Sequence, residues 1–314
     1  MKEITLPTVD QVFGSKQFLY FARYGARSAM SDFSILTNGF VSNQVHVGEK
    51  FTLDSRTGMW LTQSIKDDNN VYIINHQGCK SSISNSNRQC GIRPVLLCNE
   101  ILQKFDSLEQ FVLSNNVYSE IPVDFLYDGV LPQDEYDLIF QRYLYGELPQ
   151  KVSDMITAEK LEYLYKKDKI QKTGKLYITD TSSLSKSLNE VHLPNNFIEY
   201  FSNYSKYIRL VSGYSDYSEQ LLSDGSRVIP NYVYWIKVDP VIWIKLAPNN
   251  FISEDILLSG LQFNGYTGVN KTFVDSELYR FLNTIMLKNL EPSNVSHNKC
   301  LTMHNKSHLL SKHL

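Results

Sequence analysis

Alternating apolar and polar residues along several short segments are typical of strands that are buried on one face. This pattern predicts strands in both halves of the chain. They lie at roughly 57–63, 70–75, 91–98, 175–179 and 256–258, with a strand pair or hairpin within 197–211. Residues 77–89 are polar and rich in Ser and Asn, so we expect an exposed loop there.

The clearest strand pattern surrounds two tryptophans. Trp235 lies in the apolar alternation of 233–238, and Trp243 lies in that of 241–246. Asp239-Pro240 separates the two segments. Proline cannot donate to a sheet, so the pattern predicts two separate strands with an interruption between them.

Apolar residues at helical spacing predict four helices. The first two cover 15–29 and 32–39. The third begins after Ser153 as its N-cap, and its apolar face carries Ile156, Leu161, Leu164 and Tyr165. The fourth begins after Asp275, and its core face carries Leu278, Phe281, Leu282, Ile285 and Met286.

Composition and charge exclude several classes of protein. The chain has 314 residues, 42% apolar and 20% charged, as is typical of globular proteins. A net charge of −2 provides no basic surface for nucleic acid. No run approaches the ~20 apolar residues that span a bilayer, and residues 1–7 lack the apolar core of a signal peptide. We therefore expect cytoplasmic synthesis, no membrane insertion and no cofactor.

The segment Asp67-Asp68-Asn69-Asn70 gathers oxygen atoms that could contact Ca²⁺. The same residues are also typical of a polar hairpin tip, which we favour. Glu254-Asp255 and Asp134-Glu135 are interpreted as solvated turns or helix starts. These carboxylates therefore predict no catalytic pair.

Histidines gather in the C-terminal tail, where Cys300, His304 and His308 recur every four residues. On a helix this spacing would align them for Zn²⁺. We favour a terminal segment that contacts a partner and keep the metal as the alternative. Cys90 and Cys98 are eight residues apart, which on one strand separates them by about 26 Å, so they cannot form one redox site.

Arg93 and the three tryptophans invite a ligand-binding interpretation, because guanidinium groups and indole rings bind ligands well. An Arg near the end of a central strand more often binds carboxylates or carbonyls within the protein. Large aromatic residues in strands are more often core. We therefore assign structural roles to Arg93, Trp60, Trp235 and Trp243.

Several segments match a known pattern in altered order. Residues 145–150 (YGELPQ) resemble the opening strand of a family of domains, and 161–180 resemble the helix and strand that follow it. Residues 27–39, Trp60-Leu61-Thr62 and Gly91-Ile92-Arg93-Pro94 resemble the segments that close such a domain. The family is the uncharacterised DUF6273-like group. The resemblance implies an α+β, C-type-lectin-like fold, with a mixed, mostly antiparallel sheet and flanking helices.

The closing segments precede the opening ones, so the resemblance implies a permuted domain. Residues 1–98 would form the closing half, 99–144 a bridge, 145–291 the opening half and 292–314 a polar, His-rich tail. Two incomplete units in tandem are the alternative. We favour one permuted domain, because each half alone would leave an apolar sheet face uncovered.

The family has no assigned activity, so the resemblance predicts no function. The expected function is instead inferred from the composition of the loops. The loops at 64–70, 77–89 and 264–272 combine Asn, Gly and Ser with occasional Tyr, as binding surfaces do. Their candidate contact residues are Asp67, Asp68, Asn70, Asn85, Asn87, Tyr266 and Asn270.

These loops predict a non-catalytic module that recognises a protein or glycan, as an oligomer or in a larger assembly. The leading expectation is a phage virion or attachment component. The alternatives are an intracellular inhibitor, such as a phage-encoded anti-defence protein, and an oxidase-like enzyme.

Overall fold

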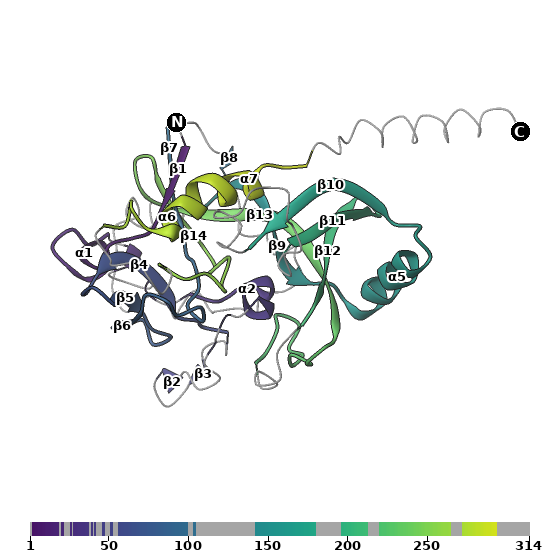
Figure 1. Cartoon of the computed structure of the whole chain (residues 1–314), viewed down its shortest axis with the longest axis horizontal. Coiled ribbons are helices and arrows are strands. Elements are labelled where there is room, and N and C mark those ends of the chain that lie inside the picture. The colour runs from purple at the N-terminus through teal and green to yellow at the C-terminus, as the bar shows by residue number, and fades with distance from the viewer. Residues whose placement is uncertain are drawn as a thin grey trace, which may run out of the picture.

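The protein has an α+β fold in which antiparallel sheets predominate and the helices are short (Figure 1). The structure is a computed structural model. It describes residues 2–18, 20–21, 26, 28–37, 39, 41, 46–47, 51–52, 56–99, 103–104, 142–179, 196–212, 220–264 and 272–293. Tyr266, Asn270, Cys300, His304, His308 and most of the bridge and tail lie outside these residues.

A nine-stranded sheet forms the framework. Its strands are β1 (Lys2–Thr5), β7 (Val95–Cys98), β8 (Gln103–Lys104), β9 (Arg142–Val152), β10 (Gln171–Ile178), β11 (Asn196–Ser202), β12 (Ser205–Val211), β13 (Val233–Ala247) and β14 (Asn250–Ser253). Hydrogen-bonded neighbours follow the order β1-β7-β14-β13-β12-β11-β10, and β9 pairs with both β13 and β8. Segments from both ends of the chain therefore share one sheet.

The two expected tryptophan strands are one continuous strand, β13, so the predicted interruption at Asp239-Pro240 is wrong. On one side of β13, β12 pairs along 233–238 and β14 pairs along 243–247. Strand β9 pairs along the opposite side over 236–244. Pro240 lies between the segments that β12 and β14 occupy, where its missing N–H breaks no bond to either strand. The sheet therefore forks at Pro240 into a β14-β7-β1 arm and a β12-β11-β10 arm.

A second sheet contains β4 (Trp60–Ile65), β5 (Asn70–Ile74) and β6 (Lys80–Ser84), and a two-stranded ribbon contains β2 (His46–Val47) and β3 (Phe51–Thr52). The expected loop at 77–89 is wrong for 80–84, which form β6. This strand has no apolar alternation, and its backbone pairs with β5 along the edge. Its polar sequence therefore carries no strand signal.

The first helix, α1, covers Val9–Phe13, which the apolar pattern did not predict. Of the described residues in the expected helix 15–29, only Tyr20 and Phe21 are helical, and 19, 22–25 and 27 lie outside the described residues. Thr8 and Gln11 form a capping box that begins the helix, and Gly14 follows its last residue. The predicted helix after 31 is confirmed as α2 (Asp32–Leu36), with the Ser31 hydroxyl accepting from the Ser34 N–H as N-cap.

Helix α5 (Met155–Lys166) is confirmed, but its N-cap is Asp154 and not Ser153. The Ser153 N–H donates instead to the Trp235 carbonyl, which fixes the entry of the helix on the sheet. Leu161 is buried as expected, whereas Ile156 is 77% exposed. The first turn therefore extends beyond the sheet face that the rest of the helix covers.

The C-terminal helix is continuous over α6 (Glu277–Phe281), a π-helical segment η4 (Leu282–Met286) and α7 (Leu287–Leu290). Its N-cap is Ser276, one residue after the expected Asp275. Leu278, Phe281, Leu282 and Met286 are fully buried, as the apolar stripe predicts. We refer to Glu277–Leu290 as the C-terminal helix.

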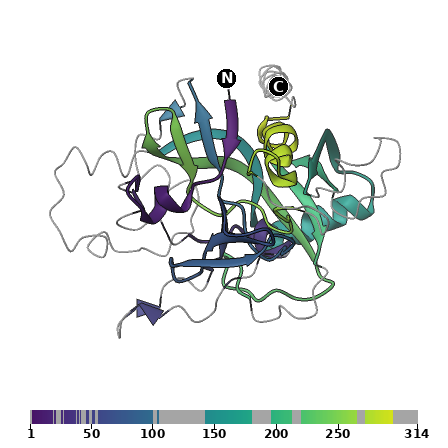
Figure 2. The ribbon, with the colours of Figure 1, turned by 60° about the vertical axis from the view of Figure 1, so that its left-hand side comes forward.

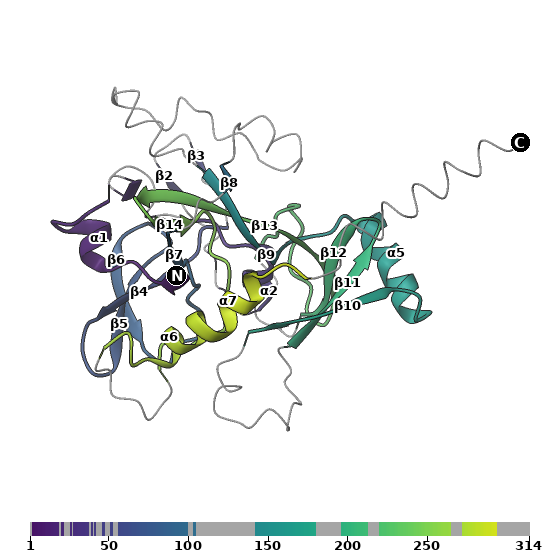
Figure 3. The same cartoon turned by 90° about the horizontal axis from the view of Figure 1, so that it is seen from above.

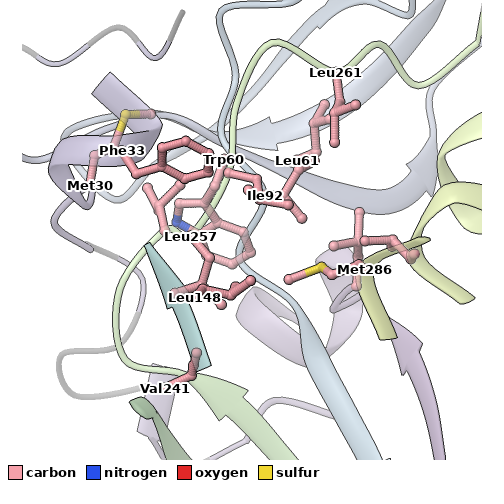
Figure 4. Packing of buried hydrophobic residues seen from close by; sticks show 14 of the residues in the cluster. Met30, Phe33, Trp60, Leu61, Ile92, Leu148, Val241, Leu257, Leu261 and Met286 are labelled. Carbon is pink, nitrogen blue, oxygen red and sulfur yellow. The ribbon is translucent and has the colours of Figure 1, made fainter. Parts of the chain in front are cut away.

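One core joins the two ends of the chain (Figure 4). Phe33 and Trp60 from the first hundred residues pack with Leu148, Leu257 and Met286 from the second half. Burial of this shared apolar surface is the main force that holds the two segments together. Among the described residues, no helix is long and apolar enough to cross a membrane.

Candidate functional site

The expected contact residues on the first two loops lie together at one end of the molecule. Asp67 to Asn70 form the tip of the β4–β5 hairpin. The Asp67 carboxylate accepts from the Asn69 N–H at 3.0 Å and from Asn70 Nδ2 at 2.8 Å. The bond from the Asn69 N–H, together with that from Asn70, lowers the pKa of Asp67. This carboxylate therefore organises its own turn.

Asn85 fastens three loops to one another. Its N–H donates to the Asn69 carbonyl at 2.9 Å, and its side-chain amide donates to the Asp68 carbonyl. Its own carbonyl accepts from the N–H groups of Phe263 and Asn264 at 2.9 and 3.1 Å. The hairpin tip, the segment after β6 and the segment leading to 265–271 therefore meet at this residue, which is 7% exposed.

Asn87 lies two residues further along the same loop, where its Oδ1 accepts from the Gln89 N–H at 2.8 Å. We call 66–70 and 85–89 the polar loop cluster. Its side chains make local turn contacts, and no group of three or more His, Cys, Asp or Glu in the described part of the chain could hold a metal ion.

Arg93 lies in the interior, with no exposed surface. Its Nε donates to the Ser253 carbonyl at 3.1 Å, and its Nη2 donates to the Tyr20 hydroxyl at 2.9 Å and the Glu254 carbonyl at 3.1 Å. The guanidinium also lies 5.6 Å from the ring centres of Tyr20 and Trp60. These contacts join the start of β7 to the end of β14.

The three tryptophans are at most 1% exposed, and each indole N–H donates within the protein. The acceptors are the Ala26 carbonyl for Trp60, the Glu162 carboxylate for Trp235 and the Tyr145 carbonyl for Trp243. None of the three rings is available for stacking on a sugar.

Sequence reasoning missed a buried charged cluster on the inner face of the β12-β11-β10 arm. The Tyr177 hydroxyl donates to Glu199 at 2.6 Å, and Glu199 has no exposed surface. Lys175 lies 4.4 Å from the Tyr177 ring centre, and Lys206 pairs with Glu147. Burial lowers the pKa of Lys175 to about 8 and raises that of Tyr177. Only strand pairing brings these residues together, so no local motif could have predicted them.

Glu254 and Asp255, which were expected to be solvated, are partly buried. Arg142 Nη2 binds the Glu254 carboxylate at 2.8 Å. Burial, with repulsion from Glu254, raises the pKa of Asp255 to about 6. The surrounding positive charges of Arg56, Lys151 and Arg93 oppose this shift.

The described cysteines are poorly suited to redox chemistry. Cys90 and Cys98 are buried, and burial raises the pKa of Cys90 to about 12. A thiol with a raised pKa holds little of the reactive thiolate. Cys79 is exposed, but it is not paired with either of them.

Several large apolar side chains are exposed on α5 and on the strands beside it. We call α5 with β10, β11 and β12 the α5 unit, which lies at the opposite end of the molecule from the β4–β6 sheet (Figures 1 and 3). Twelve large apolar side chains are exposed among the described residues. Two of them are Phe13 and Val274, and the other ten lie between 155 and 232. They are Met155, Ile156, Tyr163, Tyr165, Leu176, Ile198, Tyr204, Val211, Ile229 and Tyr232.

Register explains part of this surface. Leu176 and Ile198 are directly paired on β10 and β11, at 40% and 39% exposed. They occupy the sheet face that carries Tyr200 and Tyr207, which α5 covers through Leu161. Helix α5 therefore covers only part of an apolar face.

Comparison of the chain with protein-family models, curated proteins and solved structures finds no match. The functional interpretation therefore rests on the geometry.

Proposed function

We propose that the protein is a non-catalytic recognition module that binds a protein partner through the exposed apolar surface of the α5 unit. The observation that carries this proposal is that eight of the ten exposed large apolar residues between 155 and 232, all except Ile229 and Tyr232, lie on the α5 unit or on its β11–β12 turn. Large apolar side chains that are exposed together in one part of a folded protein often mark a contact site for another molecule. The polar loop cluster at the opposite end is the second contact surface in this proposal.

The buried chemistry supports recognition over catalysis. Arg93 binds backbone carbonyls, and Glu199 binds Tyr177 in the interior. The buried thiol of Cys90 has a raised pKa. These groups stabilise the framework, whereas a thiol-dependent oxidase would need an accessible, reactive thiol.

A permuted, C-type-lectin-like arrangement is part of the same proposal. Its support is that segments from 2–99 and 142–293 contribute to one sheet and one core. In such a framework the surfaces at both ends can vary without loss of the core.

For the biological setting we propose a phage virion or attachment component, in which a rigid module with two contact surfaces joins a larger assembly. The test is fractionation of an infected host by density gradient. Co-sedimentation of the chain with particles at fixed stoichiometry supports this setting. Recovery with one soluble host protein instead supports the inhibitor alternative.

The recognition surface is tested by affinity capture with matched variants. The double variant Ile156→Ser, Tyr163→Ser changes two exposed residues of α5, and Asp68→Ala changes an exposed residue of the polar loop cluster. We expect the α5 variant to lose a protein that the wild type and Asp68→Ala both retain. Loss with Asp68→Ala alone would transfer the contact to the loops, and equal capture by all three would refute both surfaces.

A further inference from the structure

The two arms of the forked sheet end in edge strands, β1 on one arm and β10 on the other. An edge strand presents unpaired N–H and C=O groups, which can pair with another chain. Proteins therefore cover or interrupt such edges. In this chain the C-terminal helix lies between the two edges (Figures 2 and 3).

At the β1 edge, the side chain of Asn283 takes the place of a neighbouring strand. Its Oδ1 accepts from the Ile4 N–H at 2.9 Å, and its Nδ2 donates to the Ile4 carbonyl at 2.8 Å. One carboxamide therefore binds both backbone groups that Ile4 directs away from β7. The Tyr279 hydroxyl adds a bond to the Glu3 carboxylate at 3.0 Å.

At the β10 edge, Asn289 makes the same pair of bonds. Its Nδ2 donates to the Ile178 carbonyl at 2.9 Å, and its Oδ1 accepts from the Ile178 N–H at 3.4 Å. Lys175 Nζ donates to the Asn289 carbonyl at 2.7 Å, which fixes the end of the helix against the same strand. Further along β10, the register shifts around Gly174, which has a φ of +87°. A bulge of this kind interrupts an edge.

Packing holds the helix in this position. Phe281, Leu282 and Met286 have no exposed surface. At its end, Leu290 lies so close to Gly146 that a Cβ on that glycine would come within 2.8 Å of it. The C-terminal helix therefore contacts the edge strands of both arms and also Gly146 of β9.

We propose that the C-terminal helix is a closing element whose two asparagine amides stand in for missing strands, and whose release frees β1 and β10 to pair with a second copy of the chain. Two amides on one helix, each bound to both backbone groups of one edge residue, carry this inference. It is independent of the proposed recognition surface, which lies on the other face of the β12-β11-β10 arm.

Hydrogen exchange of the wild-type protein tests, without any variant, whether the C-terminal helix covers the two edges. In urea below the unfolding transition, we expect the amides of 277–290, Ile4 and Ile178 to lose protection together and before those of β13. If Ile4 and Ile178 stay protected after the helix has exchanged, the helix does not cover the edges and the proposal is wrong.

Single variants then separate the two edges. We expect Asn283→Ala to accelerate exchange at Ile4 by about 10-fold and leave Ile178 unchanged, since it removes the acceptor of the Ile4 N–H and leaves the β10 edge as it is. Asn289→Ala should open the edge at Ile178 and leave Ile4 unchanged. Lys288→Ala, at an exposed position of the same helix, is the matched control and should change neither.

Sedimentation velocity tests pairing with a second copy. We expect the double variant Asn283→Ala, Asn289→Ala to form larger species as its concentration rises, whereas Lys288→Ala sediments as the wild type does. A double variant that exchanges faster at both edges and still sediments as the wild type would overturn the pairing with a second copy.

Discussion

Replacing Asp32 with alanine should weaken the contact between residues 2–99 and residues 142–293. Asp32 has no exposed surface and lies at the start of α2. Its carboxylate accepts from the Val152 N–H at 2.8 Å and from the Ser223 N–H at 2.7 Å, and the Ser223 hydroxyl donates to it as well. One side chain from residues 2–99 therefore binds two positions within residues 142–293.

The expected loss follows from these bonds. Alanine leaves three partly buried donors without their acceptor, and a donor left unsatisfied in a fully buried position costs about 1–3 kcal/mol. Burial raises the pKa of Asp32, so the carboxylate is itself costly to bury, and its removal offsets part of the loss. We therefore expect Asp32→Ala to lower the free energy of unfolding by about 3 kcal/mol.

Asp32→Asn is the sharper comparison, because it keeps the shape of the side chain. Its NH₂ group can face the Ser223 hydroxyl, which can accept, but it cannot accept from the Val152 N–H. The expected loss is therefore smaller, about 1–2 kcal/mol. Glu159→Gln, at an exposed position of α5, is the control and should stay within about 0.5 kcal/mol of the wild type.

Urea unfolding followed by tryptophan fluorescence is the assay, since Trp60 reports on the first segment and Trp235 and Trp243 on the second. A loss below about 1 kcal/mol for Asp32→Ala would refute the reasoning, because it is less than the expected cost of leaving three partly buried donors without their acceptor.

Three further predictions concern buried groups. Burial lowers the pKa of Lys175 from 10.5 to about 8, so between these values the unfolded chain holds a proton that the folded chain has released. Stability from this group should rise with pH over that range, and Lys175→Met should remove the rise in urea unfolding at pH 8 and 10. Asp255 is the opposite case, because its pKa is raised from 3.8 to about 6. Its contribution to stability should fall as pH rises between those values, and the difference between wild type and Asp255→Asn across pH 4 to 6 measures it. Gly146→Ala should cost about 1–3 kcal/mol in the same assay, since φ is +70° and a Cβ would come within 2.8 Å of Leu290. An alanine variant as stable as the wild type would contradict the close packing there.

The spacing of apolar residues predicted those helices and strands that bury one face in the core. The helix at α2 and the strands β4, β5, β7, β11 and β12 follow from local apolar patterns. The N-caps of α5 and α6 each lie one residue after the predicted position. Both Ser153-Asp154 and Asp275-Ser276 contain two residues that can act as an N-cap, so the pattern could not choose between them.

Features that depend on distant partners were not predictable from local patterns. β6 is polar and pairs along an edge, and Pro240 is tolerated because two other strands end on either side of it. Ile156 belongs to an apolar stripe, yet the sheet beneath α5 does not extend to it. The contacts of Glu199 and of Asn283 likewise join residues that only the fold brings together.

Crosslinking mass spectrometry of the chain with its captured partner tests the central claim most directly. Lys160 and Lys166 are exposed on α5 and Lys167 directly follows it, whereas Lys80 is exposed on β6 and Lys66 directly follows β4. The account predicts that crosslinks to the partner concentrate on the α5 lysines. Crosslinks confined to Lys66 and Lys80 would contradict it and place the partner on the polar loop cluster.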